Sequence, residues 1–124
     1  DKNNRAICGL SMGGFHSLYI SAYYPNKFGY VGLFSAATSK QINNKNTSDV
    51  YENLDQKLAT QFSNPPRLYW IGIGKTDFLY KDNIDFRKQL DEKGYKYTYV
   101  ETDGGHIWRN WRVYLTEFAP LLFK

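Results

Sequence analysis

Apolar residues gather in four short runs along the chain, and stretches with helical spacing separate them. The runs cover residues 5–9, 30–35, 68–73 and 95–101. The first three are almost continuously apolar, which is typical of parallel strands that helices cover on both faces. The fourth alternates tyrosine with lysine and threonine, as a half-exposed edge strand does. Strands that alternate with helices predict an α/β architecture of about four mostly parallel strands, with right-handed crossovers and helices on both faces.

The first two helices are predicted from their spacing and their end signals. One starts after Ser11 and runs to about Tyr23, because Pro25 disfavours helical geometry in the residue before it. The next begins near Asp49, which we take as its N-cap. Its inward face carries Leu54, Leu58 and Phe62. Between the second strand and this helix, residues 38–48 are polar and rich in asparagine, so they predict a surface loop.

Two further helices complete the pattern. The third ends at Gly94, a good position for a left-handed C-cap. Its inward side chains are expected to be Leu79, Phe86 and Leu90. The fourth should end near Pro120, because proline cannot continue a helix. Its apolar residues recur at spacings of three and four, at Trp108, Trp111, Leu115, Phe118 and Leu122.

The segment Gly9-Leu10-Ser11-Met12-Gly13 carries the strongest chemical signal of the chain. It fits G-x-S-x-G, a sharp strand-to-helix turn that presents a serine hydroxyl, and it lies between a predicted strand and a predicted helix. A Cβ at either flanking glycine is expected to collide with the folded-back chain. We therefore predict Ser11 as a nucleophile, with the backbone N–H of Met12 facing the oxyanion that forms there.

A serine hydroxyl needs a base to take its proton, and the base needs a third group to orient it. The chain has two histidines. His16 lies five residues past Ser11 in the predicted helix, so its side chain should point away from the serine. His106 follows the last predicted strand through Gly104 and Gly105, at the carboxyl end of the sheet where ligands bind in open α/β folds. This placement predicts His106 as the base.

The orienting acid should come from the end of another strand. Asp77 lies in that place, just after the third predicted strand. Asp103 is a rival, but it lies on the same turn as His106, where capping or solvation is its simpler role. Asp82 and Asp85 belong to the following helix and fit its N-terminal turn. We predict Asp77, and the resulting order of serine, aspartate and histidine is that of α/β-hydrolases.

Composition excludes several function classes. The chain of 124 residues fits one domain, and 42% apolar with 23% charged residues is ordinary for a globular protein. Its net charge of +4 comes from scattered basic residues, whereas nucleic-acid binders usually cluster them, so no nucleic-acid partner is expected. No run approaches the roughly 18 apolar residues of a membrane span, so no membrane partner is expected. The single cysteine, Cys8, is expected to be a small buried residue.

Three blocks of sequence carry a family resemblance. They are residues 5–14 around the serine, residues 72–77 up to the aspartate, and residues 104–112, which hold the histidine, two tryptophans and an arginine. On these blocks the chain resembles the feruloyl and acetylxylan esterases, which are esterase D-like α/β-hydrolases. The resemblance spans the whole chain but only the C-terminal half of the family's catalytic domain.

The resemblance implies Ser11 as the nucleophile, His106 as the general acid–base and Asp77 as its partner, with neither metal nor cofactor. It also implies hydrolysis of feruloyl or acetyl esters on plant cell-wall xylan by a secreted or periplasmic enzyme. Trp108, close to the histidine, is a candidate substrate-binding residue at the border of the acyl pocket, with core packing as the alternative. Trp111 fits core packing of the last helix.

The chain departs from the family in its N-terminal part. It opens a few residues before the first strand, whereas the family has several strands before the serine and an oxyanion loop after the third. We therefore expect residues 1–124 to form a single partial domain that lacks those strands and that loop. Because an apolar strand with an open edge pairs readily, we expect self-association or pairing with the missing N-terminal segment.

Two other functions are compatible with these residues. The same serine, aspartate and histidine could act on another small ester, such as S-formylglutathione, a lipid ester or a siderophore ester. A catalytically incomplete fragment could instead keep the site residues and serve only as a binding or structural module.

Overall fold

The computed structural model describes residues 1–38 and 49–123, and in these residues four strands form one parallel sheet. The strands are β1 (Ala6–Leu10), β2 (Tyr30–Phe34), β3 (Leu68–Gly74) and β4 (Thr98–Thr102). Their order across the sheet is their order along the chain, so β1 and β4 are its edges. The predicted parallel α/β sheet is confirmed, whereas the surface loop predicted at 38–48 falls, except for its first residue, outside the described residues.

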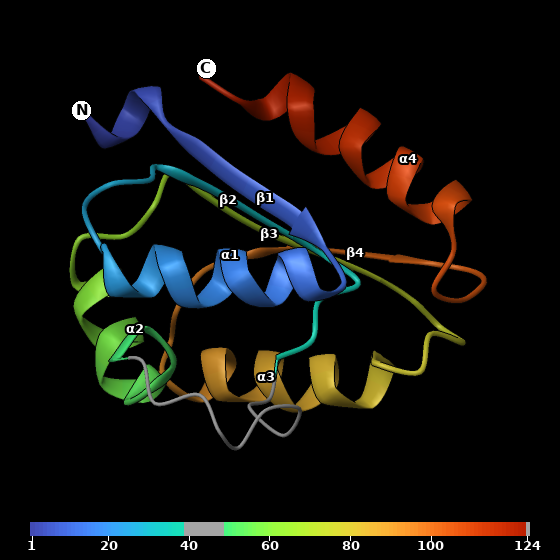
Figure 1. The fold of residues 1–124 in the computed structure, drawn as a ribbon, viewed down its shortest axis with the longest axis horizontal. Coiled ribbons are helices and arrows are strands. Elements are labelled where there is room, and N and C mark those ends of the chain that lie inside the picture. Colours follow the sequence, from blue (N-terminus) through green and yellow to red (C-terminus); the bar gives the residue numbers. More distant parts are fainter. Residues whose placement is uncertain (39–48, 124) are drawn as a thin grey trace.

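Helices cover both faces of the sheet, as predicted (Figure 1). They are α1 (Met12–Tyr23), α2 (Leu54–Ser63), α3 (Tyr80–Glu92) and α4 (Trp108–Phe118). In the described part of the chain, three short 3-10 helices accompany them, at Lys2–Asn4, Asp49–Tyr51 and Ala119–Leu121. Right-handed crossovers between strands that follow one another in a sheet all lie on the same face. The connecting helices α1, α2 and α3 therefore share one face, and α4, which follows the last strand, covers the other.

Alternation along the strands divides the interior into two hydrophobic cores. Val31 and Leu33 of β2 are buried under α1, α2 and α3, while Phe34 is buried under α4. Gly32 lets α4 approach the sheet, because a Cβ there would lie 2.9 Å from the ring of Phe118. Full burial of each large apolar side chain stabilises the fold by about 1.5–3 kcal/mol, so these cores hold the strand ends in place.

The beginning of α2 differs from the prediction. Asp49 is not the N-cap of α2. It is the first residue of a 3-10 helix, and its carbonyl accepts a hydrogen bond from the N–H of Glu52. Asn53 then takes a left-handed conformation (φ 54°) and is the residue from which α2 starts. The reason is packing, since Tyr51 of the 3-10 helix stacks on Phe15 of α1 with ring centroids 5.6 Å apart. A continuous helix from residue 49 would move that ring.

The fourth strand begins three residues later than predicted, at Thr98. Gly94 has the left-handed conformation expected of a helix end (φ 73°). The N–H of Tyr95 donates to the carbonyl of Leu90, so it closes α3 instead of entering the sheet. The Tyr95 ring stacks on Phe62 of α2, with centroids 4.5 Å apart. Residues 95–97 thus belong to the loop between α3 and β4, because the N–H of Tyr95 is bonded to the end of α3 and is not available to the sheet.

The buried face of α4 is rotated from the predicted one. Trp108 and Leu115 are exposed, although both belong to the predicted apolar face. The buried residues of the helix are Asn110, Tyr114 and Phe118. Spacing alone marks which residues are apolar, whereas the orientation of a helix depends on what the sheet admits. The predicted end near Pro120 is confirmed, because α4 stops at Phe118 and a 3-10 turn that contains the proline follows.

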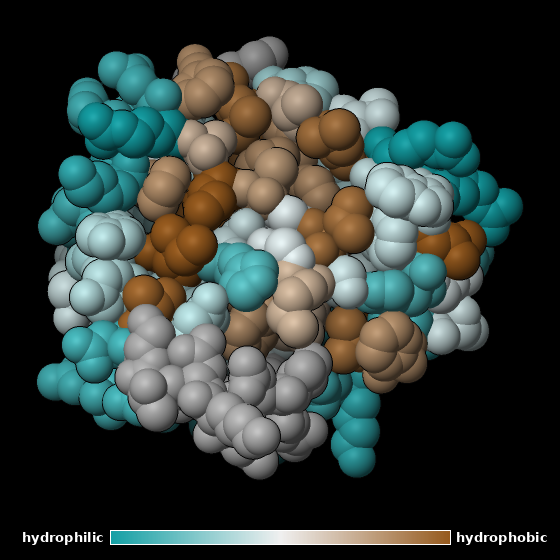
Figure 2. Space-filling model, viewed as in Figure 1, coloured by the Kyte–Doolittle hydropathy of each residue, from teal (hydrophilic) through white to brown (hydrophobic). Residues whose placement is uncertain are grey.

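The edge strand β1 accounts for a further correction, at Cys8. The prediction of a buried residue is wrong, because Cys8 is exposed. In the part of the chain that the structure describes, β1 pairs with β2 alone, so its other edge is open. Figures 1 and 2 view the molecule from this side, and hydrophobic residues gather there over β1 and between α1 and α4. The apolar sequence of β1, which is typical of a strand inside a sheet, thus lies at an open edge in the described residues.

Candidate active site

Ser11 occupies the turn between β1 and α1 in a strained backbone conformation. Its φ of 55° and ψ of −117° lie outside the regions that residues with a Cβ prefer. Three backbone hydrogen bonds fix the residue: its N–H donates to the carbonyl of Phe34 (2.8 Å), and its carbonyl accepts from the N–H groups of Phe15 (3.1 Å) and Ala37 (3.3 Å). Strain of this kind persists where the surrounding structure determines it, and it is typical of the nucleophile elbow.

The glycines around Ser11 have different steric roles. A Cβ at Gly9 would lie 2.3 Å from the carbonyl oxygen of Gly13, so the expected collision is found there. A Cβ at Gly13 would meet nothing within 4 Å, so the prediction for this second glycine is wrong. The crowded position is instead Gly14, where a Cβ would lie 2.5 Å from the Cβ of Ala36. The start of α1 packs closely against β1 and the segment after β2.

This difference predicts opposite effects for two alanine substitutions. Gly9→Ala should destabilise the chain by about 3 kcal/mol, because the atom that it meets belongs to the backbone and overpacking of this kind is expensive. Gly13→Ala should be neutral or stabilise the chain by up to about 1 kcal/mol, since alanine favours helix over glycine. Urea unfolding of both variants measures this, and equal destabilisation would contradict the steric assignment.

Ser11, His106 and Asp77 form one hydrogen-bonded row. His106 Nε2 lies 2.9 Å from Ser11 Oγ, and His106 Nδ1 lies 2.9 Å from Asp77 Oδ2. The other carboxylate oxygen of Asp77 accepts the N–H of Leu79 at 2.9 Å, and the carboxylate is fully buried. Because an ionised carboxylate only accepts hydrogen bonds, Nδ1 carries the proton of the neutral ring. Nε2 is then free to accept the proton of the serine.

The loops after β3 and β4 bring the acid and the base together. Gly74 permits their contact, because a Cβ there would lie 2.2 Å from the carbonyl oxygen of Gly104. That carbonyl accepts the N–H of Thr76 at 3.1 Å. Asn110 of α4 is buried, and its side-chain amide donates to the carbonyls of Asp103 and Gly105. The backbone just before His106 is thus held by the loop after β3, through Thr76, and by α4, through Asn110.

The rival residues of the sequence prediction lie apart from this row. The side chain of Asp103 is 94% exposed and pairs with Lys75 at 3.6 Å. Asp82 lies in the first turn of α3, as predicted, whereas Asp85 lies beyond that turn and is exposed. His16 is also exposed, and its Nδ1 lies 3.1 Å from the hydroxyl of Tyr51.

The comparisons with known proteins decide the family. The Esterase family model matches residues 1–122 of the chain. The chain belongs to the Esterase family. Among its relatives is an endo-1,4-beta-xylanase/feruloyl esterase of Xylanibacter ruminicola, 29% identical over 126 residues, which cover 100% of this chain and 15% of that protein. An acetyl esterase of Caldicellulosiruptor saccharolyticus is 28% identical over 144 residues, with 95% of this chain and 54% of that protein covered.

Solved structures with the same fold are also esterases or related hydrolases by name. The S-formylglutathione hydrolase of Staphylococcus aureus matches with a TM-score of 0.80 at 22% identity, over 99% of this chain and 52% of that one. A ferulic acid esterase from Anaeromyces mucronatus matches with a TM-score of 0.80 at 23% identity, over 98% of this chain and 45% of that one. At such identities the likeness shows the α/β-hydrolase-like fold. The chain spans about half the length of these structures.

The candidate site has an aromatic rim, of which the sequence predicted only a part. Trp108 is 67% exposed at the start of α4, and its ring contacts Trp111 with centroids 5.0 Å apart. The ring that contacts His106 from α4 is that of Trp111, at 5.0 Å. On another side lies Phe78, 75% exposed and 4.8 Å from the His106 ring. The core packing predicted for Trp111 is confirmed, because the residue packs, partly buried, against the core under α4, but helical spacing did not indicate its contact with His106. Nothing but proximity to Asp77 in the sequence marked Phe78.

Met12 is the first residue of α1, directly after the serine. The first N–H groups of a helix have no acceptor within it, and the helix dipole makes this end positive. A negative oxygen beside Ser11 would therefore meet a favourable field. This placement is compatible with the predicted oxyanion role of Met12.

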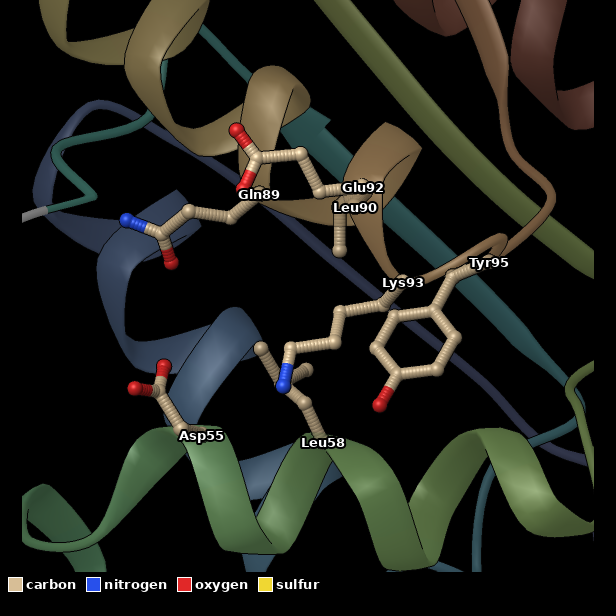
Figure 3. Close-up of a pocket in the computed structure, with 7 residues that line it drawn as sticks. All are labelled: Asp55, Leu58, Gln89, Leu90, Glu92, Lys93 and Tyr95. Atoms are coloured by element: carbon tan, nitrogen blue, oxygen red, sulfur yellow. The ribbon is translucent and has the colours of Figure 1, made fainter.

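A separate hollow lies between α2 and α3, away from these residues (Figure 3). It has a volume of about 220 Å³ and is lined by Asp55, Leu58, Gln89, Leu90, Glu92, Lys93 and Tyr95. None of the three hydrogen-bonded site residues lines it, so we assign it no part in the chemistry. Among residues 1–38 and 49–123, no three histidine, cysteine, aspartate or glutamate side chains are grouped to hold a metal ion. None of the helices described is long and apolar enough to span a membrane.

Proposed function

We propose that this member of the Esterase family is a serine carboxylic-ester hydrolase that works through an acyl-enzyme. The observation that carries the proposal is the hydrogen-bonded row of Ser11, His106 and Asp77, with 2.9 Å at both steps. The strained turn presents the serine, and the buried carboxylate sets the tautomer of the base. These are the three parts that activation of a serine nucleophile requires.

The geometry supports a two-step reaction. Ser11 Oγ bonds to the ester carbonyl carbon while His106 Nε2 takes the hydroxyl proton, and the carbonyl oxygen becomes an oxyanion near Met12 N–H. His106 then gives the proton to the leaving alcohol as its bond to carbon breaks, which leaves the acyl group on the serine. A water molecule then loses its proton to His106 and attacks the acyl carbon. The bond between that carbon and Ser11 Oγ breaks, His106 returns the proton to Oγ, and the acid leaves. Asp77 stays ionised throughout and holds the imidazolium.

We propose feruloyl esters on plant cell-wall xylan as the substrates, with acetyl esters second. The support is the feruloyl esterase and acetyl esterase names of the relatives, the exposed ring of Phe78 beside His106, and the exposed ring of Trp108, which contacts Trp111. An aromatic acyl group can pack on such rings. A polysaccharide substrate cannot enter a cell, which supports a secreted or periplasmic location.

The open edge of β1 supports a proposal about the assembled protein. We propose that a strand from outside residues 1–124 completes this edge, and that a loop of the same segment supplies a second oxyanion N–H. Exposed Cys8, the apolar surface over β1 in Figure 2 and the half-length match to the relatives support it. Self-association through the same edge is the alternative outcome.

One experiment tests both the reaction and the edge. The chain of 124 residues is assayed on methyl ferulate, acetylated xylan, p-nitrophenyl acetate and S-formylglutathione, with light scattering on the same samples. We expect the highest kcat/KM on methyl ferulate, with turnover lowered by roughly 100- to 1000-fold where one oxyanion donor is absent.

Preference for S-formylglutathione would replace the substrate proposal. A folded chain that neither turns over any ester nor reacts with a fluorophosphonate would leave only a binding or structural role. A stable monomer at all concentrations would contradict the edge proposal.

A further inference from the structure

We propose that Trp111 and Ser35 act as a positioning pair that holds the imidazole of His106 in line with Ser11. This inference rests on the proposed ester hydrolysis. The ring of Trp111 meets the ring of His106 edge to face, with centroids 5.0 Å apart and planes at 87°. The Nε1–H of Trp111 donates to Ser35 Oγ at 3.0 Å. The indole is thus fixed at its nitrogen while its ring borders the base.

Ser35 is a rigid acceptor. It is fully buried directly after β2, and its φ of 47° places it in the left-handed region. Its N–H donates to the carbonyl of Gly72 in β3 at 2.8 Å. A residue with a Cβ is strained in this conformation by about 1–3 kcal/mol, and it stays there only when its surroundings determine it. The position of the hydroxyl is therefore set by the sheet.

The segment that contains Ser35 also holds the nucleophile. The carbonyl of Phe34, one residue earlier, accepts the N–H of Ser11, and the N–H of Ala37 donates to the carbonyl of Ser11 at 3.3 Å. Residues 34–37 thus contact Ser11 through their backbone. They also reach His106, through the bond from Trp111 to Ser35 and the contact of the Trp111 ring with the imidazole. A shift of His106 relative to Ser11 would have to disturb one of these contacts.

A second connection ties the pair to the strand that precedes His106. The hydroxyl of Tyr114, one turn beyond Trp111 in α4, hydrogen-bonds the hydroxyl of Thr102 at the end of β4, at 2.7 Å. The helix that carries Trp111 is thus held to β4 by Tyr114, and to the residue after β2 by the bond from Trp111 to Ser35.

The imidazole needs such a contact because its two hydrogen bonds leave one motion open. Bonds at Nδ1 and Nε2 fix the ring along one axis, and tilting about that axis strains neither bond greatly. Phe78 lies on another side of the ring, but it is largely exposed and so restrains the ring less. The Trp111 ring, 5.0 Å away, opposes the tilt that would misdirect the lone pair of Nε2.

The test separates this role from general stability. Trp111→Phe keeps an aromatic ring but removes the N–H, and Ser35→Gly removes the acceptor while relieving the left-handed strain. We expect each variant to lower kcat on p-nitrophenyl acetate by about 10- to 100-fold with KM within twofold, as small misplacements do. The double variant should match the worse single variant, because both changes break one contact. Unchanged kcat in Trp111→Phe, or losses that multiply in the double variant, would overturn the proposal.

Trp70→Phe is the matched control. Trp70 is buried in the same core, and its ring contacts those of Tyr114 and Phe118. Its replacement by phenylalanine removes an indole just as Trp111→Phe does. We expect its kcat to stay within threefold of the parent at a temperature where all variants are folded. A kcat loss in Trp70→Phe equal to that in Trp111→Phe would show a packing effect and overturn the proposal.

A readout without turnover separates this proposal from the proposed function. In the parent chain, the His106 Nδ1–H proton bonded to Asp77 should give a low-field NMR signal that exchanges slowly. Trp111→Phe and Ser35→Gly should broaden or lose that signal, and Trp70→Phe should keep it. If the parent shows the signal but hydrolyses no ester, the proposed function fails while the positioning role stands. If the signal is equally sharp in all variants, the positioning role fails.

Discussion

Ester hydrolysis by the chain is expected to disappear in Ser11→Ala. The substitution removes the oxygen that forms the acyl-enzyme, and loss of a serine nucleophile in such a site lowers kcat by about 10⁶-fold. The change is small in volume, so the fold should be retained. Turnover of p-nitrophenyl acetate and covalent labelling by a fluorophosphonate both measure the effect. Labelling should fall to background, because this reagent reacts with the activated hydroxyl.

Ser63→Ala is the control for this result. Ser63 is exposed at the end of α2, and its hydroxyl donates to the carbonyl of Thr60. Its removal should leave labelling and turnover unchanged. Label that persists in Ser11→Ala at the level of the parent would remove Ser11 from the role of nucleophile.

The second large effect is expected from Asp77→Asn. Asp77 is buried, and its two carboxylate oxygens accept from Leu79 N–H and His106 Nδ1–H. An amide at this position can offer its N–H₂ to Nδ1, which favours the tautomer that carries the proton on Nε2. That tautomer cannot take the proton of Ser11, so kcat should fall by about 10⁴-fold while KM changes little. Steady-state kinetics on a soluble ester measures the split.

Asp103→Asn tests the rival acid with the same chemical change. Asp103 is the nearer aspartate to His106 in sequence, but its side chain is exposed and pairs with Lys75. An exposed ion pair contributes little, at about 0–1 kcal/mol, so kcat should stay within threefold. If Asp103→Asn has the larger loss, the orienting acid assigned by the structure is wrong.

The two predictions together separate the chemistry from the assembly of the domain. A chain limited by an absent oxyanion donor would still label at Ser11 and would still depend on Asp77. A chain that is folded but in which His106 is not aligned with Ser11 would show neither labelling at Ser11 nor dependence on Asp77. The ratio of each variant to the parent is therefore more informative than the absolute rate of the parent.

Much of the site followed from local sequence. The strand, the glycine at position 9 and the helix after Ser11 are neighbours in the chain, and together they define the turn that presents the serine. His106 and Asp77 were predicted from topology, because the carboxyl ends of parallel strands meet at one rim of the sheet. The element boundaries were less predictable: the 3-10 helix before α2 and the late start of β4 depend on which partner a ring or an N–H finds.

The remaining features were decided by contacts between distant segments. Trp111 and Ser35 are 76 positions apart, and helical spacing alone could not tell an indole that borders the base from one that fills the core. The close packing of α4 on the sheet depends on the space that Gly32 leaves for Phe118, and the exposure of Cys8 follows from the open edge of β1. The sequence by itself determined the fold class and indicated which serine, aspartate and histidine form the hydrogen-bonded row, because periodicity and the G-x-S-x-G turn are local signals. Only the tertiary structure decided how the base is held and which faces stay exposed, because these depend on the packing of surfaces that meet only after the chain has folded.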